Sequence, residues 1–322
     1  MAIEDSPELD STLSPDESAE NMAKIHDAFK KAGVIAASIK KDAAGLVNPG
    51  ESALDIAETV EKMTRDAGAA PGFPCNISIN DVAAHYTPET KDELLIGEKD
   101  LVKVDFGVSI GGCVADTAFS VDLSGENGPL MDASIAALED AVATIKPGIT
   151  TGAVGAVIEK QIRARGFKPI ENLSSHMIEP FRLHAGIDVP SYANGATYEM
   201  QEGEVYAIEP FATTGAGRVA DQPQVEIFSV VGEGRLRMRS SRELLGKLVS
   251  RYFTLPFAER WLVSDFKSKL VLSVTLKELI NSGCLYPYPV LREVNRGMVA
   301  QFENTLIIEH DGAKVISGVI KP

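Results

Sequence analysis

The sequence is poor in cysteine and contains no long hydrophobic run. Its three cysteines, Cys75, Cys113 and Cys284, include no CxxC pair among the 322 residues, which disfavours a disulfide framework and favours a reducing compartment. No stretch of about 18 uncharged apolar residues occurs, so neither a membrane-spanning helix nor a membrane partner is expected. The N-terminus lacks the basic and apolar segments of a secretory signal. We therefore expect a cytoplasmic protein.

Basic residues are also scarce. The chain has 31 Lys and Arg against 46 Asp and Glu, a net charge of -15. This disfavours nucleic acid as a partner, because phosphate binding needs clustered cations. Residues 1–20 contain seven acids and no Lys or Arg, which predicts an acidic, disordered tail. Hydrophobic residues make up 44% of the chain, enough for residues 21–322 to form a soluble domain with a large core.

One segment of the sequence is repeated at an offset of 98 residues, and we call it the duplicated phrase. In the first copy, Ser52 is placed to cap a helix that runs to about Ala67 and ends at Gly68. A helical pattern over residues 22–44 precedes this copy, and another over residues 130–145 precedes the second. We therefore expect an internal duplication, with a cleft between two related halves. The seven identities pair Pro49 with Pro147, Gly50 with Gly148, Glu61 with Glu159, Lys62 with Lys160, Arg65 with Arg163, Gly68 with Gly166 and Pro71 with Pro169.

Two apolar stretches joined by a glycine pair predict a β-hairpin, with strands over residues 101–108 and 113–121. With the turn at the glycines, Asp105 faces Ala118. Asp116 then points to the same face of the sheet, because it lies two residues from Ala118. Buried carboxylates this close repel each other unless a divalent cation lies between them. A hairpin whose acids face solvent is the alternative at this point.

Three of the five histidines lie in segments unlike a hydrophobic core, namely His85, His176 and His184. Taken singly, each is more often structural than a metal ligand. Glu209 and Glu303 lie inside apolar strand patterns, where an acid is costly unless it is paired. These five residues are therefore candidates for a polar site.

The composition changes between residues 226 and 289, where Arg and Lys become common. Helical patterns over residues 241–252 and 274–282 predict a compact insert rather than a separate domain. The last predicted strands follow it, over residues 298–308 and, after a turn, 314–319.

Together these segments resemble the type II methionine aminopeptidases, which are metallopeptidases of the pita-bread fold. The resemblance covers nearly the whole chain from about residue 21. The insert over residues 226–289 marks the type II class, and the short N-terminus is similar to that of archaeal members. The resemblance implies an α+β fold with an internal pseudo-twofold repeat and a helical, winged-helix-like insert. The matching stretches are Phe73–Pro88, Asp105–Gly107, Ala115–Ala118, His176–Gly186, Tyr206–Glu209 and Ala300–Glu303.

The resemblance implies five metal ligands, Asp105, Asp116, His176, Glu209 and Glu303. Asp116 and Glu303 would bridge two divalent ions. Asp105 would complete one site, and His176 with Glu209 would complete the other. Four carboxylates balance the charge of two dications, so the cluster is compatible with a low-dielectric cleft. The donor set suits Co, Mn, Fe or Zn.

The activity implied is removal of the N-terminal methionine from nascent proteins and peptides whose second residue is small. Metal-activated hydroxide would attack the first peptide bond. Glu209 would transfer the proton to the leaving amine, His184 would donate to the developing oxyanion, and His85 would contact the scissile nitrogen. Peptides that begin with Met are the expected partners, together with nascent chains on the ribosome. The methionine side chain would enter an apolar pocket formed by Phe73, Leu183 and Tyr288.

Three positions depart from the family pattern. Ser175 stands where Gly usually precedes His176, and a side chain there is able to tilt this ligand or narrow access to it. Asn304 stands where His often follows Glu303, which changes a hydrogen bond behind the ligands. Cys75 is expected to be a small buried filler, and the alternative is a thiol that binds an unintended metal or oxidises.

Two alternatives remain from other classes. A non-catalytic pita-bread interaction protein is disfavoured because all five ligand positions are filled. An X-Pro peptidase is disfavoured because fewer than 50 residues precede the first repeat, whereas those enzymes usually carry a large N-terminal domain.

Overall fold

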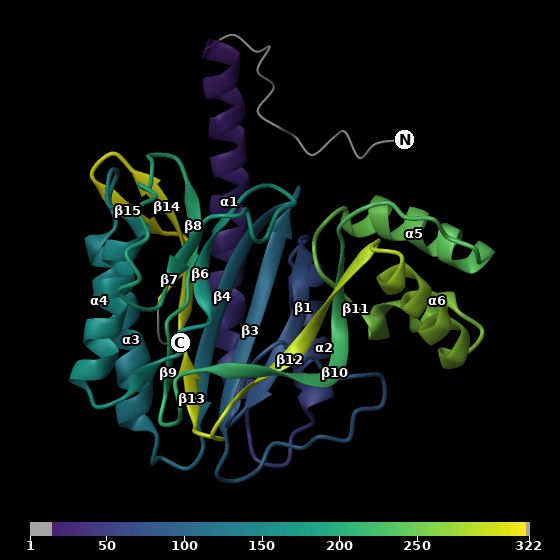
Figure 1. Cartoon of the computed structure of the whole chain (residues 1–322), viewed down its shortest axis with the longest axis horizontal. Helices are drawn as coiled ribbons and strands as arrows, with labels where there is room; N and C mark the ends of the chain where they lie inside the picture. The colour runs from purple at the N-terminus through teal and green to yellow at the C-terminus, as the bar shows by residue number, and fades with distance from the viewer. Residues whose placement is uncertain (1–14, 320–322) are drawn as a thin grey trace.

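The computed structural model describes residues 15–319, and its centre is a curved sheet of eight strands (Figure 1). The two halves of this sheet meet at one pairing, between β4 and β14. The order across the sheet is β1 (Ala70–Ile79), β3 (Leu101–Ile110), β4 (Cys113–Asp122), β14 (Glu303–Glu309), β8 (Val205–Ile208), β6 (Ser174–Ile178) and β7 (Asp188–Pro190), with β15 (Gly312–Val315) paired to β14.

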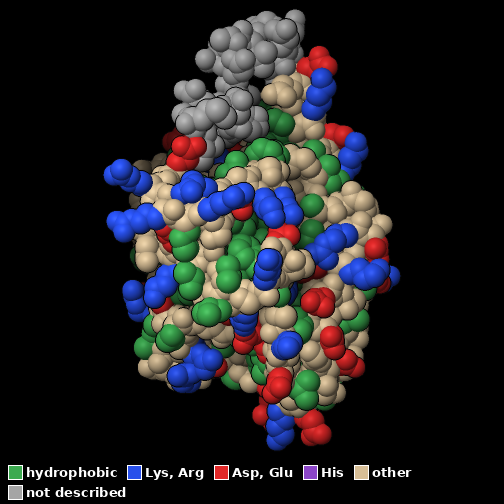
Figure 2. Space-filling view, turned by 90° about the vertical axis from the view of Figure 1, so that its right-hand side faces the viewer, with side chains coloured by type: hydrophobic (Ala, Val, Ile, Leu, Met, Phe, Trp, Pro, Cys, Tyr) green, Lys and Arg blue, Asp and Glu red, His purple; other side chains and the backbone are tan. Residues whose placement is uncertain are grey.

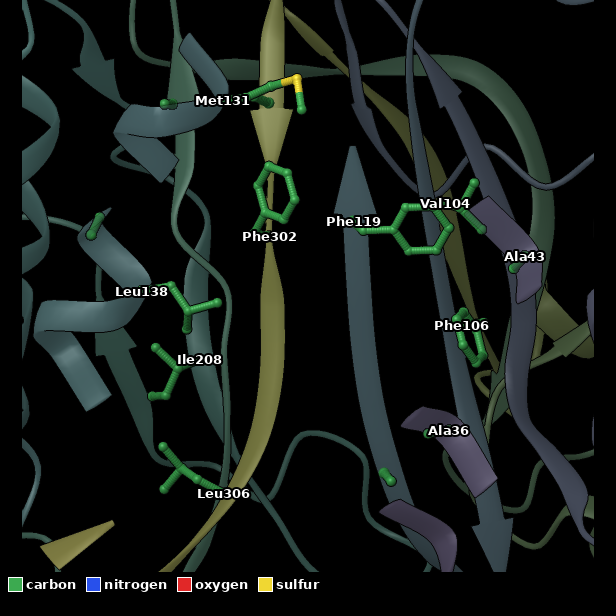
Figure 3. Close-up of a cluster of buried hydrophobic side chains, with 14 of the residues drawn as sticks. Ala36, Ala43, Val104, Phe106, Phe119, Met131, Leu138, Ile208, Phe302 and Leu306 are labelled. Atoms are coloured by element: carbon green, nitrogen blue, oxygen red, sulfur yellow. The ribbon is translucent and has the colours of Figure 1, made fainter. Parts of the chain in front are cut away.

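Two pairs of helices cover the sheet. Helices α1 (Pro15–Ala43) and α2 (Ala53–Asp66) pack on β1, β3 and β4, and α3 (Gly128–Thr144) with α4 (Thr151–Ala164) covers the other half. Figure 3 shows that the hydrophobic core extends to both sides of β14. Near α1 the core contains Ala36, Ala43, Val104, Phe106 and Phe119, and near α3 it contains Met131, Leu138, Ile208, Phe302 and Leu306. The helix layers bury the back of the sheet and leave its other face for a site.

The duplicated phrase forms the same structure twice, as the sequence predicts. Helices α2 and α4 each contain 14 residues and begin at equivalent positions of the repeat. Ser52 and Thr150 are the matching caps, since each side-chain oxygen accepts a hydrogen bond from a first-turn amide at 3.3 Å. Gly50 and Gly148 adopt φ values of 85° and 84°, which favour glycine. The repeat therefore supplies one helix pair to each half of the sheet.

The hairpin also has the expected register. Asp105 pairs with Ala118, and Ile110 pairs with Cys113 across a turn whose two glycines both have positive φ. Asp105 and Asp116 therefore lie on the same face of the sheet.

Some boundaries differ from the sequence predictions. The helix expected from residue 22 begins at Pro15, so it starts inside the stretch expected to be tail; residues 1–14 lie outside the described residues. The strand expected over residues 298–308 is two strands, β13 (Val299–Gln301) and β14, separated at Phe302. The amide of Phe302 donates to Ser134 Oγ at 3.0 Å rather than to a neighbouring strand.

The break at Phe302 sends the chain from one sheet to another. β13 pairs with β9 (Phe211–Thr213), which pairs with β5 (Lys168–Pro169) in a three-stranded sheet. The strand expected over residues 314–319 is β15, which begins and ends earlier because it pairs with β14 through a tight turn.

The expected helical insert lies at one side of the main sheet (Figure 1). Its strands β10 (Val219–Val230), β11 (Phe257–Ala258) and β12 (Leu285–Glu293) form a sheet with β2 (Val82–Ala84) of the body. Helix α5 (Arg239–Tyr252), a 3₁₀ helix (Glu259–Asp265) and α6 (Lys269–Asn281) pack around their own core. Helix α6 begins earlier than expected because Ser268 caps it through the amide of Val271.

The insert differs from the rest of the chain in charge and is fastened by a buried ion pair. Residues 231–284 carry ten Lys and Arg but only five Asp and Glu, and Figure 2 shows many basic side chains on this side of the molecule. Arg260 pairs with Glu61 of α2 and also donates to Thr87, while Trp261 Nε1 donates to Glu61 at 2.8 Å. Among the described residues, no helix has the length and apolar character needed to cross a membrane.

Candidate metal centre

Two predicted ligands lie in one row that crosses the junction between the two halves of the sheet. Asp105 on β3 and Glu303 on β14 both pair with Ala118 of β4. Asp116 lies two residues before Ala118 and therefore projects from the same face. The hairpin and the strand that follows the insert thus place three carboxylates together.

The other two predicted ligands come from the second half of the sheet. His176 on β6 pairs with Ala207 of β8, and Glu209 directly follows that strand. His176 Nε2 lies 3.4 Å from Glu209 Oε1 and 3.8 Å from Asp116 Oδ2. All five side chains line one cavity of about 200 Å³.

The donor atoms of this cluster fit a divalent metal. Potential ligand atoms of Asp116, His176 and Glu303 lie within 4.8 Å of one another, and all three residues are buried. Asp105 Oδ1, Asp116 Oδ1 and Glu303 Oε2 are buried without a hydrogen-bond partner among the described residues. Unpartnered buried carboxylate oxygens are costly, and divalent cations prefer such oxygens as ligands.

The pKa values of the acids give the same indication. Burial raises the pKa of Asp105 to about 7, against hydrogen bonds from Gln301 and Asn76. Burial, followed by the charge of Asp105, raises the pKa of Asp116 well above its usual range. Burial and neighbouring acids do the same for Glu209 and Glu303. Without cations, these carboxyl groups therefore keep their protons to a higher pH than free carboxyl groups do.

The two further histidines predicted from the sequence border the same cavity. The ring centre of His184 lies 4.3 Å from that of His176, and the ring of His85 meets Tyr288 edge-on at 5.6 Å. Burial lowers the pKa of His85 to about 4 and also lowers the pKa of His184. Both imidazoles are therefore neutral at pH 7, so each carries one donor and one acceptor nitrogen.

The three residues of the predicted methionine pocket also line this cavity. Phe73 comes from β1, Leu183 from the segment after β6, and Tyr288 from β12 of the insert. A side chain at Gly107, opposite Phe73 in the sheet, would place its Cβ 2.6 Å from the Phe73 ring. Glycine at that position therefore leaves the space that the Phe73 ring occupies next to the strand.

The model for metallopeptidase family M24 matches residues 27–309. The chain belongs to metallopeptidase family M24. Membership in this family and the buried cluster support divalent metal ions as cofactors.

Curated members of the family from archaea are similar along most of their length. A methionine aminopeptidase of Thermococcus kodakarensis is 47% identical over 290 residues, which cover 90% of this chain and 98% of the relative. A methionine aminopeptidase of Methanothermobacter thermautotrophicus is 42% identical over 299 residues, 92% of this chain and 100% of the relative. The resemblance to the type II methionine aminopeptidases is therefore confirmed.

Solved structures of lower identity confirm the fold. A methionine aminopeptidase from Thermotoga maritima has a TM-score of 0.68 and 21% identity, covering 92% of this chain and 97% of that chain. A thermophilic Arx1 has a TM-score of 0.81 and 17% identity, covering 92% and 91%. The α+β pita-bread fold with its internal repeat is the one that the sequence predicts.

The departures from the M24 pattern have structural explanations. The Ser175 side chain points away from the cavity's ligands and accepts a hydrogen bond from the Glu209 amide at 2.9 Å, which ties β6 to the end of β8. Asn304 Oδ1 accepts from Ser317 Oγ at 3.0 Å behind the sheet. Burial raises the pKa of the Cys75 thiol well above its usual range, so the thiol stays protonated and packs as a small apolar group.

Sequence reasoning missed three polar residues at this M24 site. Asn76 pairs with Asp105 in the sheet, and Gln301 Nε2 donates to Glu209 Oε2 at 3.3 Å. Lys40 lies behind the sheet at Glu303. Gln301 precedes Glu303 by two residues in the apolar sequence pattern over residues 298–308, and this spacing was a usable signal. Nothing in the local sequence around Lys40 indicates the site.

Proposed function

We propose that the chain is a dinuclear metalloaminopeptidase that removes N-terminal methionine when the second residue is small. The observation that carries this proposal is the convergence of four buried carboxylates and one imidazole in a cavity that also has an apolar wall. The archaeal relatives of 42% and 47% identity are named methionine aminopeptidases, which supports the same activity. Peptides that begin with Met, and nascent chains on cytoplasmic ribosomes, are the proposed substrates.

The geometry supports a division of the ligands between two ions. Asp116 and Glu303 lie centrally and are the proposed bridges, with Asp105 on the hairpin side. His176 and Glu209 lie 3.4 Å apart on the other side. Co, Mn, Fe and Zn all suit this donor set. When bound, two such ions lower the pKa of water and polarise the peptide carbonyl.

The remaining steps belong to side chains of the chain itself. Glu209 is the proposed proton carrier, because its Oε1 faces His176 and its Oε2 is held by Gln301. Neutral His184 is the proposed donor to the developing oxyanion. Neutral His85 is the proposed partner of the scissile nitrogen; its Nδ1 lies 3.2 Å from the carbonyl oxygen of Pro289, which sets the ring orientation.

The proposed specificity follows from the wall of the cavity. Phe73, Leu183 and Tyr288 offer an apolar surface suited to an unbranched thioether. Tyr288 is contributed by the insert, and its hydroxyl lies 3.2 Å from Ser229 Oγ. We therefore propose that residues 21–322 act as one catalytic unit in which the insert, over residues 226–289, completes the substrate pocket.

Peptide hydrolysis tests this function directly. Protein reconstituted with Mn²⁺ or Co²⁺ is incubated with Met-Ala-Ser and with acetyl-Met-Ala-Ser, and with a chelator as control. Release of Met from the free peptide alone, lost on chelation, is expected. Cleavage of neither peptide by metal-loaded protein would instead favour the non-catalytic interaction protein.

A further inference from the structure

Lys40 is a buried cation directly behind the proposed metal ligands. It lies in the last turn of α1 with 1% of its surface exposed. Its Nζ donates to Thr117 Oγ1 at 2.9 Å and to the Glu303 carbonyl oxygen and Asn304 Oδ1, both at 3.1 Å. An ammonium group has three N–H donors, so all of them are used here.

These partners belong to the short pairing that joins the two halves of the sheet. Strands β4 and β14 pair only through Glu303 with Ala118 and Asn304 with Thr117. Thr117 Oγ1 also bonds the Glu303 carbonyl oxygen, at 2.9 Å. Thr305 Oγ1 accepts from the amide of Asp116 and donates to its carbonyl oxygen, both at 2.7 Å. Lys40 adds three further bonds to this short junction, from the side of α1.

The junction is also where the two proposed bridging ligands stand. Side chains alternate between the faces of a strand, so Asp116 and Glu303 project into the cavity while the neighbouring Thr117 and Asn304 project toward α1. Any slip between β4 and β14 would change the spacing of the two carboxylates. Lys40 bonds this junction from the α1 side, opposite the cavity into which the two carboxylates project.

We propose that Lys40 is a positioning residue that holds Asp116 and Glu303 at the separation required to bind two divalent metal ions. The proposal rests on the metal site proposed above. A lysine is an expensive residue to bury, and an apolar residue at this place in α1 would pack on the sheet without that cost. The three hydrogen bonds to one strand junction are interactions that an apolar residue at this position could not make.

The chain offers a matched control in Lys103. This lysine is also fully buried, and burial lowers the pKa of each lysine to about 7. Lys103 Nζ donates to the carbonyl oxygens of Asn80 and Val299, neither of which belongs to a proposed ligand. Lys103→Met therefore removes a comparable buried cation without loosening the β4–β14 junction.

The experiment measures Mn²⁺ binding to metal-free full-length protein by calorimetry, with thermal unfolding recorded for the same samples. Lys40→Met is expected to weaken Mn²⁺ binding by about 10- to 100-fold, as loss of a group that orients ligands typically does. Lys103→Met is expected to unfold at a lower temperature but to bind Mn²⁺ like the wild type. Thr117→Val, which keeps the shape of the side chain, is expected to weaken binding as well.

Each result bears on the proposal. Wild-type affinity in Lys40→Met, or equal loss of affinity in both lysine variants, would overturn the positioning role and leave the proposed function intact. Should Lys40→Met fail to fold, Thr117→Val decides: weakened binding supports the role, and wild-type affinity overturns it. Absence of Mn²⁺ binding in the wild type would instead refute the proposed metal site.

Discussion

Asp105 and Glu303 pair with the same residue, Ala118, from opposite sides of strand β4. Ala118 is fully buried, and its methyl group lies on the same face of the sheet as both carboxylates. A small residue in the middle of the row leaves space between two acids that come from distant parts of the sequence. The proposed metal site therefore depends on a residue that is not a ligand.

Filling this space should impair metal binding while every ligand remains. Ala118→Val adds two methyl groups between the carboxylates and is expected to lower the number of Mn²⁺ ions bound per chain, measured by metal analysis after dialysis. Ala115→Val is the control, because Ala115 is buried on the same strand but its side chain points to the other face. Both substitutions should cost about 1–3 kcal/mol of stability. Equal metal content in the two variants would contradict the role of Ala118.

Removing a bridging charge should abolish turnover and stabilise the metal-free protein. Asp116→Asn keeps the shape but removes a ligand proposed to be shared by two ions, so release of Met from Met-Ala-Ser should fall below detection. Because Asp116 is buried beside other acids, the metal-free variant should unfold at a higher temperature than metal-free wild type at pH 8. A variant that keeps full activity would rule out the dinuclear mechanism.

Loss of His184 should slow the reaction without loss of metal. His184→Ala is expected to lower kcat by about 10²-fold or more, the scale of a missing oxyanion donor, with bound metal unchanged. His26→Ala serves as control, because His26 does not line the cavity of the cluster; its Nε2 lies 2.8 Å from the Gly203 carbonyl oxygen. An unchanged kcat in His184→Ala would remove this residue from the mechanism.

Metal loading should change how stability depends on pH. The pKa of Asp105 is about 7 in the folded metal-free protein and 3.8 as its ordinary value, so the folded state binds more protons between these values. The stability that this group contributes is present below pH 4 and is lost as pH rises through 7.

The measurement compares unfolding temperatures of metal-free and Mn²⁺-loaded protein at pH 5 and pH 8. The increase in unfolding temperature on metal loading should be larger at pH 8, where the metal no longer competes with protons for the carboxylates. His85 acts in the opposite direction to Asp105. Burial lowers its pKa to about 4, so its contribution to stability increases as the pH rises. Because His85 is present in both forms, its effect largely cancels in the comparison. A gain independent of pH would contradict the raised acid pKa values.

Breaking the buried ion pair between the insert and α2 should lower the free energy of unfolding. Arg260→Met leaves buried Glu61 with only the half-exposed Arg65 as a charged partner, which should cost about 3–5 kcal/mol in denaturant unfolding. The double variant with Glu61→Gln should recover much of this loss. Arg65→Ala removes the half-exposed partner of Glu61 at 3.3 Å and should cost under about 1 kcal/mol. Similar costs for Arg260 and Arg65 would show that the pair does not anchor the insert.

Much of the site was predictable because its signals are local. Strand alternation and one glycine turn are enough to place Asp105 and Asp116 on one face of a hairpin, and the structure has that register. The duplicated phrase predicts α2 and α4 because caps, apolar spacing and glycine stops act within a few residues. The ligand set as a whole required the resemblance to a family, since no local rule connects His176 with Glu303.

Other features were decided only by tertiary contacts. The strand break at Phe302 is invisible in the alternation pattern, because it arises where Ser134 of α3 takes the amide that a neighbouring strand would have bonded. Lys40 is one of several lysines on an amphipathic helix until the sheet buries it behind Glu303.

The two glutamates of the repeat separate what the sequence determines from what the tertiary structure determines. The sequence by itself determined that Glu61 and Glu159 occupy equivalent turns of equivalent helices, each four residues before an arginine. Only the tertiary structure decided that the insert buries Glu61 against Arg260, while Glu159 stays partly exposed. Helix spacing and capping depend on neighbours a few residues away, whereas burial depends on segments nearly 200 residues apart in the chain.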